Sequence, residues 1–443
     1  MLKKWPVLLL LGFVFMFGLM ACSSDDTTDE NANGTNEGSN LQNNEQNEEG
    51  NNVSEEEVEI TYYSFSASPN YEAELDQMIA AFEEKYPNIK VNKELAAYND
   101  YFTKLQTRIA GKTAPDVFEL NYESFVQYAS KGTLADLTEF VETDEDFDAT
   151  QLNEQAFKAY QYDGKQYGMV ESFSNVLTFY NKDLFDQAGL EYPTADWTWE
   201  DELEAAKQLT DKENNIWGTY APVTMNEFYK IAAQNGGAIF NEDGSPAINS
   251  EENLEALTYM VENATKHGVA PSPADMSGQS PEDLFLNGQL AILHTGIWMF
   301  GSFKDAPFNW DIQLEAGNTQ KAHHFFANGL AVSADSEKKE AAYKFASFMS
   351  ASEEAAKIRI GASWELPAIT DDAILAPYLE QTPPENREAV FEALNTLVLP
   401  PVVENWSRLS DKTNEEFQKA LYGEKTPKEV LETLEEEFNS IMN

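Results

Sequence analysis

The chain has 443 residues, of which 77 are acidic and 29 basic, so its formal net charge at pH 7 is −48. Only part of this excess lies near the N-terminus. So much negative charge repels phosphate backbones and argues against nucleic acid as a partner. A solvated acidic surface, suited to saline or alkaline surroundings outside the cell, is the simplest interpretation.

The first 22 residues have the features of an export signal. Lys3 and Lys4 precede an apolar run, residues 5–20, that is too short to span a bilayer as a mature helix. Cys22 is the only cysteine, so no intrachain disulfide can form. The run Leu-Met-Ala-Cys that ends at Cys22 resembles a bacterial lipoprotein signal, in which the cysteine is lipidated and holds the mature chain on a membrane surface. The alternative is a buried thiol that happens to follow a signal peptide.

Residues 23–57 consist of Asp, Glu, Asn, Gly, Ser, Thr and Gln with almost no apolar side chain. This composition buries too little apolar surface to offset the entropy of ordering, so we expect a disordered acidic tether that spans on the order of 30 Å. About 385 residues remain beyond it. Since 42% of the whole chain is hydrophobic, this remainder is long enough for two domains with separate cores.

Strands and helices alternate directly after the tether. The periodicity and the Pro and Gly breaks predict, in chain order, a strand over 58–63, a helix over 71–86, a strand that starts at 89–91, a helix over 101–110 and a strand over 114–120. This β-α-β-α-β order predicts a mostly parallel sheet with helices on both faces.

The rest of the chain is richer in helices, and we find no internal repeat. The predicted elements are strands over 176–180, 290–293 and 330–332 and helices over 200–209, 251–267 and 336–349, with a turn at 241–244. Pairs of prolines at 383–384 and 400–401 mark joints between later segments.

Short motifs spread over nearly the whole mature chain occur together in one order. They are Phe-Glu-Glu-Lys-Tyr-Pro at 82–87, Ala-Gly-Lys-Thr-Ala-Pro-Asp-Val at 110–117, Gly-Thr-Leu-Ala-Asp-Leu at 132–137, Tyr-Asn-Lys-Asp-Leu-Phe at 180–185, Trp-Thr-Trp-Glu at 197–200, Asn-Gly-Gly at 235–237, Gly-Gln-Leu-Ala-Ile at 288–292 and Gly-Ile-Trp at 296–298. Each is weak alone, but in this order the chain resembles the sugar-binding family of bacterial extracellular solute-binding proteins, the receptors that feed ABC importers.

The resemblance implies a two-lobed α/β fold of the periplasmic-binding-protein type II class, with a hinge of three chain segments. It predicts lobe 1 over 58–173 plus 329–373 and lobe 2 over 174–328 plus 374–443. The segment around Tyr180 would then be the first strand of lobe 2. Tyr180 and Trp199 are expected to be ordinary core aromatics.

Ligands of open α/β sheets bind at the carboxyl ends of the strands, which selects the candidate contacts. A sugar site needs aromatic platforms for C–H faces and planar polar side chains for hydroxyls. The predicted ligand-binding residues are Phe65, Glu119, Asn121, Tyr122, Ser174, Asn226, His294, Trp298, Asn328 and Trp406. Trp298 and Trp406 match aromatic positions of the family, whereas Leu120 stands where a family member carries an aromatic residue, a loss for which Tyr122 is placed to compensate.

We predict neither a metal site nor a cofactor. His323 and His324 are adjacent, so in an extended segment their side chains point to opposite faces, and we expect a solvent-exposed or hinge-side pair. The acidic residues around Asp211 lack the spacing and the early glycine of a calcium loop, so we expect a turn there.

The favoured hypothesis is a non-catalytic receptor, lipid-anchored on the extracellular face of the membrane. As a monomer, it would close its lobes on a carbohydrate, most simply an oligosaccharide, and deliver it to the permease subunits of an ABC importer. A surface-tethered glycoside hydrolase is the rival, but no strand end carries a pair of carboxylates. A receptor for another polyol or for glycerol phosphate is weaker, because no Arg/Lys cluster follows a strand.

Overall fold

The structure, a computed structural model, describes residues 57–67 and 70–442, which belong to one compact unit. The signal segment with Cys22 lies outside the described residues, as does the tether except for Glu57. Within the described part of the chain, no helix is both long and apolar enough to cross a membrane.

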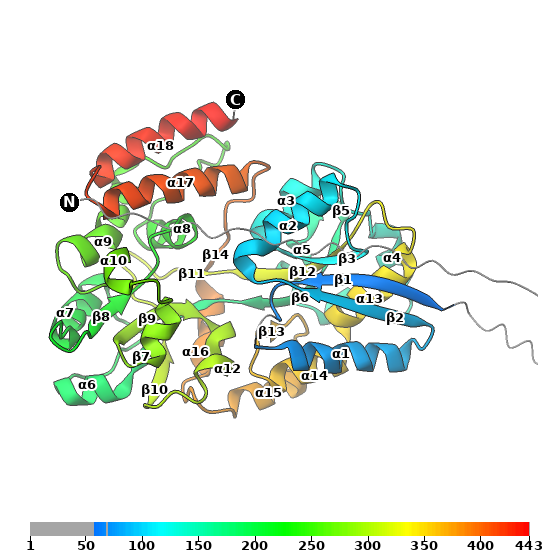
Figure 1. Ribbon diagram of the computed structural model, residues 1–443, viewed down its shortest axis with the longest axis horizontal. Coiled ribbons are helices and arrows are strands. Elements are labelled where there is room, and N and C mark those ends of the chain that lie inside the picture. Colours follow the sequence, from blue (N-terminus) through cyan, green and yellow to red (C-terminus); the bar gives the residue numbers. More distant parts are fainter. Residues whose placement is uncertain (1–56, 68–69, 443) are drawn as a thin grey trace, which may run out of the picture. The chain divides into compact units, whose positions relative to one another are not determined.

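The larger of two main sheets has six strands in the order β13-β6-β12-β3-β1-β2 (Figure 1). Its strands are β1 (Val58–Ser64), β2 (Ile89–Leu95), β3 (Val117–Asn121), β6 (Gly168–Ser174), β12 (Phe326–Val332) and β13 (Leu366–Pro367). β1 runs parallel to β2 and β3, and β12 runs antiparallel to both of its neighbours, β3 and β6, so β6 points the same way as the first three strands. The expected parallel arrangement is confirmed for β1, β2 and β3, but β12 and β13 run against them and make the sheet mixed, because β12 returns from the second sheet and needs no crossover helix.

The smaller main sheet has four strands in the order β10-β7-β9-β8. They are β7 (Val176–Asn181), β8 (Trp217–Tyr220), β9 (Leu290–Gly296) and β10 (Trp310–Gln313). Only β8 and β9 are parallel. Two short pairs complete the strands: β4 (Gln161–Tyr162) with β5 (Lys165–Gln166), and β11 (His323–His324) with β14 (Leu397–Val398).

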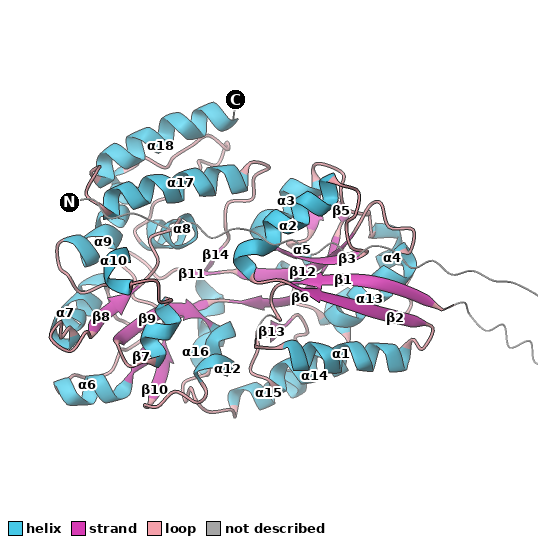
Figure 2. Cartoon of the chain, in the orientation of Figure 1, coloured by secondary structure: helices cyan, strands magenta, loops and turns pink. Residues whose placement is uncertain are grey.

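Helices surround both sheets, as Figure 2 shows. We use lobe 1 for the six-stranded sheet with α1 (Glu72–Lys85), α2 (Tyr98–Ala110), α3 (Tyr122–Ala129), α4 (Thr138–Thr143), α5 (Glu154–Lys158), α13 (Lys339–Ala351) and α14 (Glu353–Gly361). Lobe 2 is the four-stranded sheet with α6 (Lys182–Ala188), α7 (Trp199–Leu209), α8 (Met225–Gln234), α9 (Glu251–Thr265), α10 (Pro273–Met276), α11 (Pro281–Leu286), α12 (Phe300–Phe303), α17 (Trp406–Leu421) and α18 (Pro427–Met442). α15 (Asp372–Leu379) and α16 (Glu388–Ala393) lie in the segment that leads from lobe 1 to lobe 2, and the short 3₁₀ turns are η1 (Ala149–Gln151), η2 (Ile297–Met299) and η3 (Leu394–Thr396).

The helices predicted from strong periodicity are confirmed within a few residues. α7 starts where Thr198 forms a capping box with Asp201, which satisfies two backbone amides of the first turn. Several boundaries differ by three or four residues: α2 begins at Tyr98, β3 at Val117, β12 at Phe326 and α13 at Lys339. Just before β3, the Asp116 carboxylate accepts hydrogen bonds from the amide and hydroxyl of Thr61. Tyr180 and Trp199 are buried, as expected for core aromatics.

The chain passes between the sheets at Asn175, between β6 and β7, and at Phe325, between β11 and β12, with a third connection through α15. The expected two-lobed α/β architecture with three connecting segments is thus confirmed, while the residue limits of the lobes stay a prediction. Next to the crossings, the buried hydroxyl of Tyr160 lies 2.8 Å from the carbonyl oxygens of both Leu120 and Ala327 and so holds β3 and β12 together.

Candidate functional site

The loop after β1 is shaped by a buried carboxylate at the end of β3. Glu119 Oε2 accepts hydrogen bonds from Ser64 Oγ at 2.8 Å and from the amides of Phe65 and Ser66 at 2.9 and 3.0 Å. Its side chain is fully buried. Glu119 therefore fixes the position of Phe65, one of the predicted contacts. These three hydrogen bonds all come from residues 64–66.

Two polar side chains at the same edge of lobe 1 have unused hydrogen-bonding atoms. Asn121 Nδ2 donates to the hydroxyl of Tyr98 at 3.1 Å and to Glu123 Oε1 at 2.7 Å. Among the described residues, Asn121 Oδ1 and Glu123 Oε2 have no partner although both are buried. Burial raises the pKa of Glu123 to about 7, so near neutral pH this carboxyl can both accept and donate.

Aromatic rings surround this polar pair. Tyr98 is 48% exposed and contacts the ring of Phe65 edge to face at 5.3 Å. Tyr122, the residue between Asn121 and Glu123, is half-buried and packs edge to face on Phe325 at 5.9 Å. The strand ends of lobe 1 therefore combine apolar faces with hydrogen-bonding groups.

A row of four rings runs from lobe 2 to Phe326, the first residue of β12 in lobe 1. Trp298 lies 5.9 Å from Phe326, Phe326 stacks on His324 at 4.8 Å, and His324 meets Tyr229 edge to face at 5.3 Å. The Trp298 indole folds back over Gly296, where an added Cβ would lie 1.9 Å from the ring. The Gly-x-Trp motif is thus needed for the orientation of the ring, since any other residue at position 296 would displace it.

Polar atoms accompany the ring row as well. Within the described part of the chain, the hydroxyl of Tyr229 and Asn226 Oδ1 have no hydrogen-bond partner. Burial raises the pKa of Tyr229, and the Glu123 carboxylate adds to this effect. We refer to the group around Asn121 and Glu123 and to the ring row as the two half-sites.

Ser174 and Asn328 lie at the crossing segments and bind one buried carboxylate. Glu365 accepts from Ser172 Oγ at 2.6 Å, from Ser174 Oγ at 3.3 Å and from Asn328 Nδ2 at 3.0 and 3.1 Å. Glu365 therefore connects the ends of β6 and β12. The role of Ser174 and Asn328 as sugar contacts stays a prediction.

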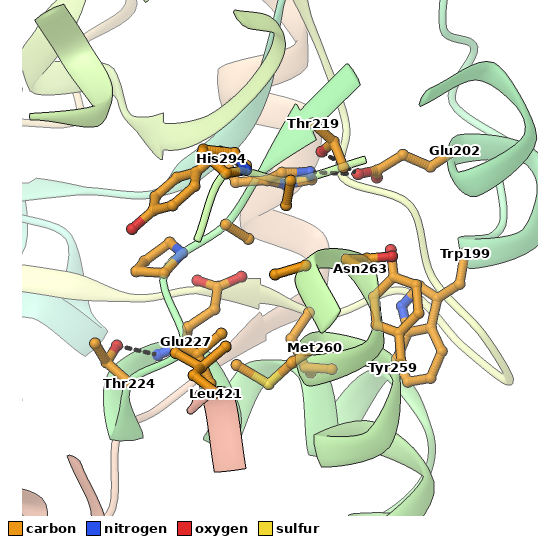
Figure 3. A pocket seen from close by; sticks show the side chains of 18 of the residues that line it. Trp199, Glu202, Thr219, Thr224, Glu227, Tyr259, Met260, Asn263, His294 and Leu421 are labelled. Carbon is orange, nitrogen blue, oxygen red and sulfur yellow. Dashed lines mark hydrogen bonds and ion pairs between the residues drawn. The ribbon is translucent and has the colours of Figure 1, made fainter. Parts of the chain in front are cut away.

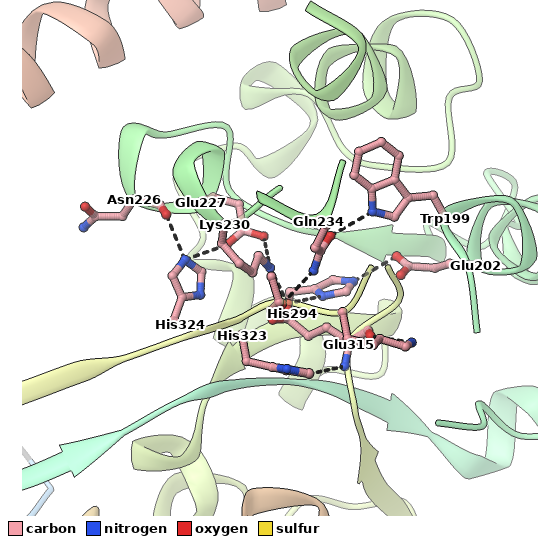
Figure 4. A network of polar contacts seen from close by, with 12 residues as sticks. Trp199, Glu202, Asn226, Glu227, Lys230, Gln234, His294, Glu315, His323 and His324 are labelled. Carbon is pink, nitrogen blue, oxygen red and sulfur yellow. Dashed lines mark hydrogen bonds and ion pairs between the residues drawn. The ribbon is translucent and has the colours of Figure 1, made fainter. Parts of the chain in front are cut away.

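His294 belongs to a buried network of charges in lobe 2 (Figure 4). Its Nε2 lies 2.9 Å from Glu202 Oε1 and its Nδ1 lies 2.9 Å from Glu315 Oε1. Burial opposes the charge, but the two carboxylates outweigh it and raise the pKa of His294 to about 10. Lys230 joins Glu315 to Glu227, so three carboxylates surround two cations. Both ring nitrogens of His294 are engaged within the protein.

Of the two expected positions for His323 and His324, the hinge-side one is confirmed and the solvent-exposed one is wrong. They are 0% and 1% exposed, because β11 lies inside lobe 2 beside β14 just before the chain crosses to lobe 1. Their side chains do point apart: His323 bonds to Thr396 and the amide of Glu315, and His324 bonds to the carbonyl of Asn226. Burial lowers the pKa of His323 to about 4 and that of His324 to about 3, so both are neutral. Among the described residues no group of His, Cys, Asp and Glu is arranged to hold a metal.

A cavity of about 120 Å³ lies next to this network, inside lobe 2 (Figure 3). It is bounded by α7, α8 and α9, with His294, Glu227 and Asn263 on its wall. Trp199 stacks on Tyr259 at 4.4 Å and donates to Gln234, which closes one end of the cavity.

The segment that begins at Asp211 forms a turn, as expected. The Asp211 carboxylate accepts hydrogen bonds from the backbone amides of Glu213 and Asn214.

Trp406 begins α17 and is 3% exposed, packed in the apolar cluster of α8, α9, α17 and α18. The next residue, Ser407, donates to Gln127 of α3 at 2.9 Å. A groove of about 920 Å³ between α2, α3 and α17 opens beside this contact, lined by Tyr128 and Arg408 among others. The role of Trp406 as a ligand platform stays a prediction.

Five residues of these half-sites were not among the ligand-binding residues predicted from the sequence: Tyr98, Glu123, Tyr229, His324 and Phe326. Glu123 lies in the first turn of α3 and Tyr229 in the middle of α8, where an acid or an aromatic is ordinary, and Tyr98 is the first residue of α2, which was expected to begin at residue 101. Glu123 follows Asn121 by two residues, and this closeness to a strand end was the one available signal.

The fold and the paired strand ends are those of a two-lobed receptor of the type II class. The chain belongs to the bacterial extracellular solute-binding protein family, whose model matches residues 67–356. The ABC substrate-binding protein Lmo0181 from Listeria monocytogenes, solved in complex with cycloalternan, is 65% identical; the match covers 87% of this chain and 99% of that one, with a TM-score of 0.86. A solute-binding protein from Thermotoga lettingae bound with α-D-tagatose shares the fold at 23% identity, 87% and 100% coverage and a TM-score of 0.79.

An arabinooligosaccharide-binding protein of Bacillus subtilis is 27% identical over 258 residues, which are 56% of this chain. The chain spans only 57% of the length of that relative.

Proposed function

We propose that the chain is a carbohydrate receptor that closes its two lobes on an oligosaccharide and delivers it, unchanged, to the permease subunits of an ABC importer. The observation that carries this proposal is that the partly exposed rings of Trp298 and Phe326 occur together with the unpartnered atoms of Asn121 and Glu123 at the strand ends. Sugar rings present C–H faces to aromatic rings and hydroxyls to such polar atoms. His324 and Tyr229 are buried and continue the row behind these two rings.

Cycloalternan is the first probe to use, because the relative solved with it is 65% identical and covers 87% of this chain. The sugar would touch both lobes and would favour closure only through the extra contacts made in the closed arrangement. Both oxygens of Glu365 are engaged by hydroxyls and by Asn328, and Glu119 Oε2 is engaged by backbone amides and a hydroxyl, which supports a binding rather than a hydrolytic role.

The proposal is tested by calorimetry of the chain without its first 57 residues against cycloalternan and a panel of linear oligosaccharides. Trp298→Ala should weaken binding roughly 5- to 150-fold, corresponding to about 1–3 kcal/mol for an aromatic platform. The thermal stability of the free protein should change little, since a half-buried ring leaves no sealed cavity.

Trp197→Ala is the matched control, because Trp197 is a half-buried indole of lobe 2 that packs near Phe185 and away from the ring row. Unchanged affinity in Trp298→Ala together with lost thermal stability would assign the indole to the core instead. New reducing ends after overnight incubation with stoichiometric protein would replace the receptor by a hydrolase.

We also propose that the receptor is a monomer held at the extracellular face of the membrane by a lipid on Cys22. The family's role outside the cell and the Leu-Met-Ala-Cys run support this location. Cys22→Ser should release the protein into the medium, and retention of the processed variant in the membrane fraction would contradict the anchor.

A further inference from the structure

Two hydrogen bonds join the start of α1 in lobe 1 to the segment after β9 in lobe 2. The hydroxyl of Tyr71 donates to the carbonyl oxygen of Trp298 at 2.9 Å. Beside it, Asn70 Nδ2 donates to Ser302 Oγ at 2.7 Å. One of these bonds holds the backbone of the residue whose ring begins the aromatic row.

Tyr71 is held rigidly by lobe 1. It is 6% exposed, and its ring stacks on Trp364 at 4.6 Å with an angle of 7° between the planes. The guanidinium of Arg359 lies 4.2 Å from the same indole and pairs with Glu171. Burial raises the pKa of Tyr71, so its hydroxyl keeps the proton that it donates.

Lobe 2 has a notch for this ring at Gly301, in α12. A Cβ at position 301 would lie 2.6 Å from the Tyr71 hydroxyl oxygen and 3.1 Å from two ring carbons. Since Gly301 does not lie in the left-handed region and is helical, alanine would suit its backbone and even raise helix propensity. The missing side chain matters only because Tyr71 occupies its place.

We propose that Tyr71 is an interlobe latch and a positioning residue for the sugar platform: on closure its ring enters the notch at Gly301 and its hydroxyl fixes the main chain of Trp298. This inference rests on the proposed carbohydrate function. The latch joins the lobes in the arrangement of this structure, so it stabilises that closed arrangement and lengthens the lifetime of the bound sugar without touching the sugar itself.

Two substitutions remove the latch from opposite sides. Tyr71→Phe deletes the hydroxyl and should weaken cycloalternan binding roughly two- to tenfold, the effect of one net hydrogen bond, through faster dissociation. Gly301→Ala keeps the hydroxyl but blocks the notch, so its effect should be larger. Tyr343→Phe is the matched control, because the Tyr343 hydroxyl bonds to Asp144 within lobe 1.

Dissociation rates by stopped flow and the radius of gyration by small-angle scattering, each with and without cycloalternan, decide the question. Faster dissociation and a larger radius with sugar in both latch variants, with Tyr343→Phe like the wild type, is the expected result. If the wild type binds sugar and closes, but Tyr71→Phe and Gly301→Ala have the same dissociation rate and radius as the wild type, the latch is wrong and the proposed function stands. If the wild type itself binds no sugar of the panel, the proposed function fails. In that case the test of the latch is the radius of gyration of the ligand-free protein. We expect it to be larger in Gly301→Ala than in the wild type, and an unchanged radius would reject the latch.

Discussion

Both lobes bury clusters of charge, but they neutralise them differently. In lobe 2, Lys230 and His294⁺ lie among Glu202, Glu227 and Glu315, and every one of these carboxylates contacts a cation. In lobe 1, Arg359 is the cation of a cluster that contains Glu119, Glu171 and Glu365. Glu119 and Glu365 are stabilised largely by hydroxyls, amides and the Asn328 side chain.

This difference between the lobes shifts the pKa values of the buried carboxyl groups of Glu315 and Glu171 in opposite directions. Burial opposes ionisation of Glu315, but Lys230 and His294 hold its pKa well below its usual range. Burial and the neighbouring Glu119 and Glu365 raise the pKa of Glu171 to about 8, although Arg359 lowers it. The buried cluster of lobe 2 is therefore an ionic network. In the cluster of lobe 1, which has Arg359 as its cation, Glu171 keeps a proton near neutral pH.

The largest effect should come from removing the central cation of lobe 2. Lys230 is fully buried and pairs with Glu227 at 2.6 Å as well as with Glu315. Lys230→Met leaves three buried carboxylates with His294 as their cation, so the free energy of unfolding should fall by about 3–5 kcal/mol in urea titrations. Lys165→Met is the control, because Lys165 pairs with Asp136 while 54% exposed and should cost less than about 1 kcal/mol. Equal losses of unfolding free energy in the two variants would mean that the buried network stabilises the protein no more than an exposed ion pair does.

A smaller effect should separate the lobes by pH. The folded pKa of Glu171, about 8, exceeds its ordinary value of 4.5, so the folded state binds the extra proton and stability falls as pH rises through that window. His294 is raised from 6.5 to about 10, so its contribution is complete below pH 6.5 and is lost toward pH 10.

Glu171→Gln should therefore flatten the pH dependence of urea unfolding between about pH 4.5 and 6.5 and make it shallower between about pH 6.5 and 8, where His294 also contributes; the decline from about pH 8 to 10 belongs to His294 and should remain. His294→Gln, although less stable throughout, should retain the lower window and lose the upper one. A Glu171→Gln profile parallel to that of the wild type would show that the lobe 1 cluster does not hold the proton.

Local features of the fold were predictable because they depend on near neighbours. The apolar spacing in α1 and α9 and the capping residues of α7 are sufficient to place those helices. The insertion of β12 between β3 and β6 was not predictable, since Asn328 pairs with Asn121, a residue more than 200 positions away. The same is true of the burial of His323 and His324, which depends on β14.

The candidate site divides in the same way. Strand ends point to Phe65, Asn121 and Trp298 from sequence alone. The engagement of His294 by carboxylates from α7 and from the segment after β10 required the tertiary structure. Gly301 lies in an apolar run without any signal, because its role depends on a tyrosine from the other lobe.

The contact between Asn70 and Ser302 has a practical consequence. Cys22 is the only cysteine of the whole chain, so a recombinant protein that lacks it can carry one thiol at a chosen position. A fluorophore attached at Ser302→Cys would sit at the rim where the lobes meet and would lose water contacts each time they close. Its emission would follow occupancy in real time, which turns the receptor into a reagentless sensor for the sugar that it binds.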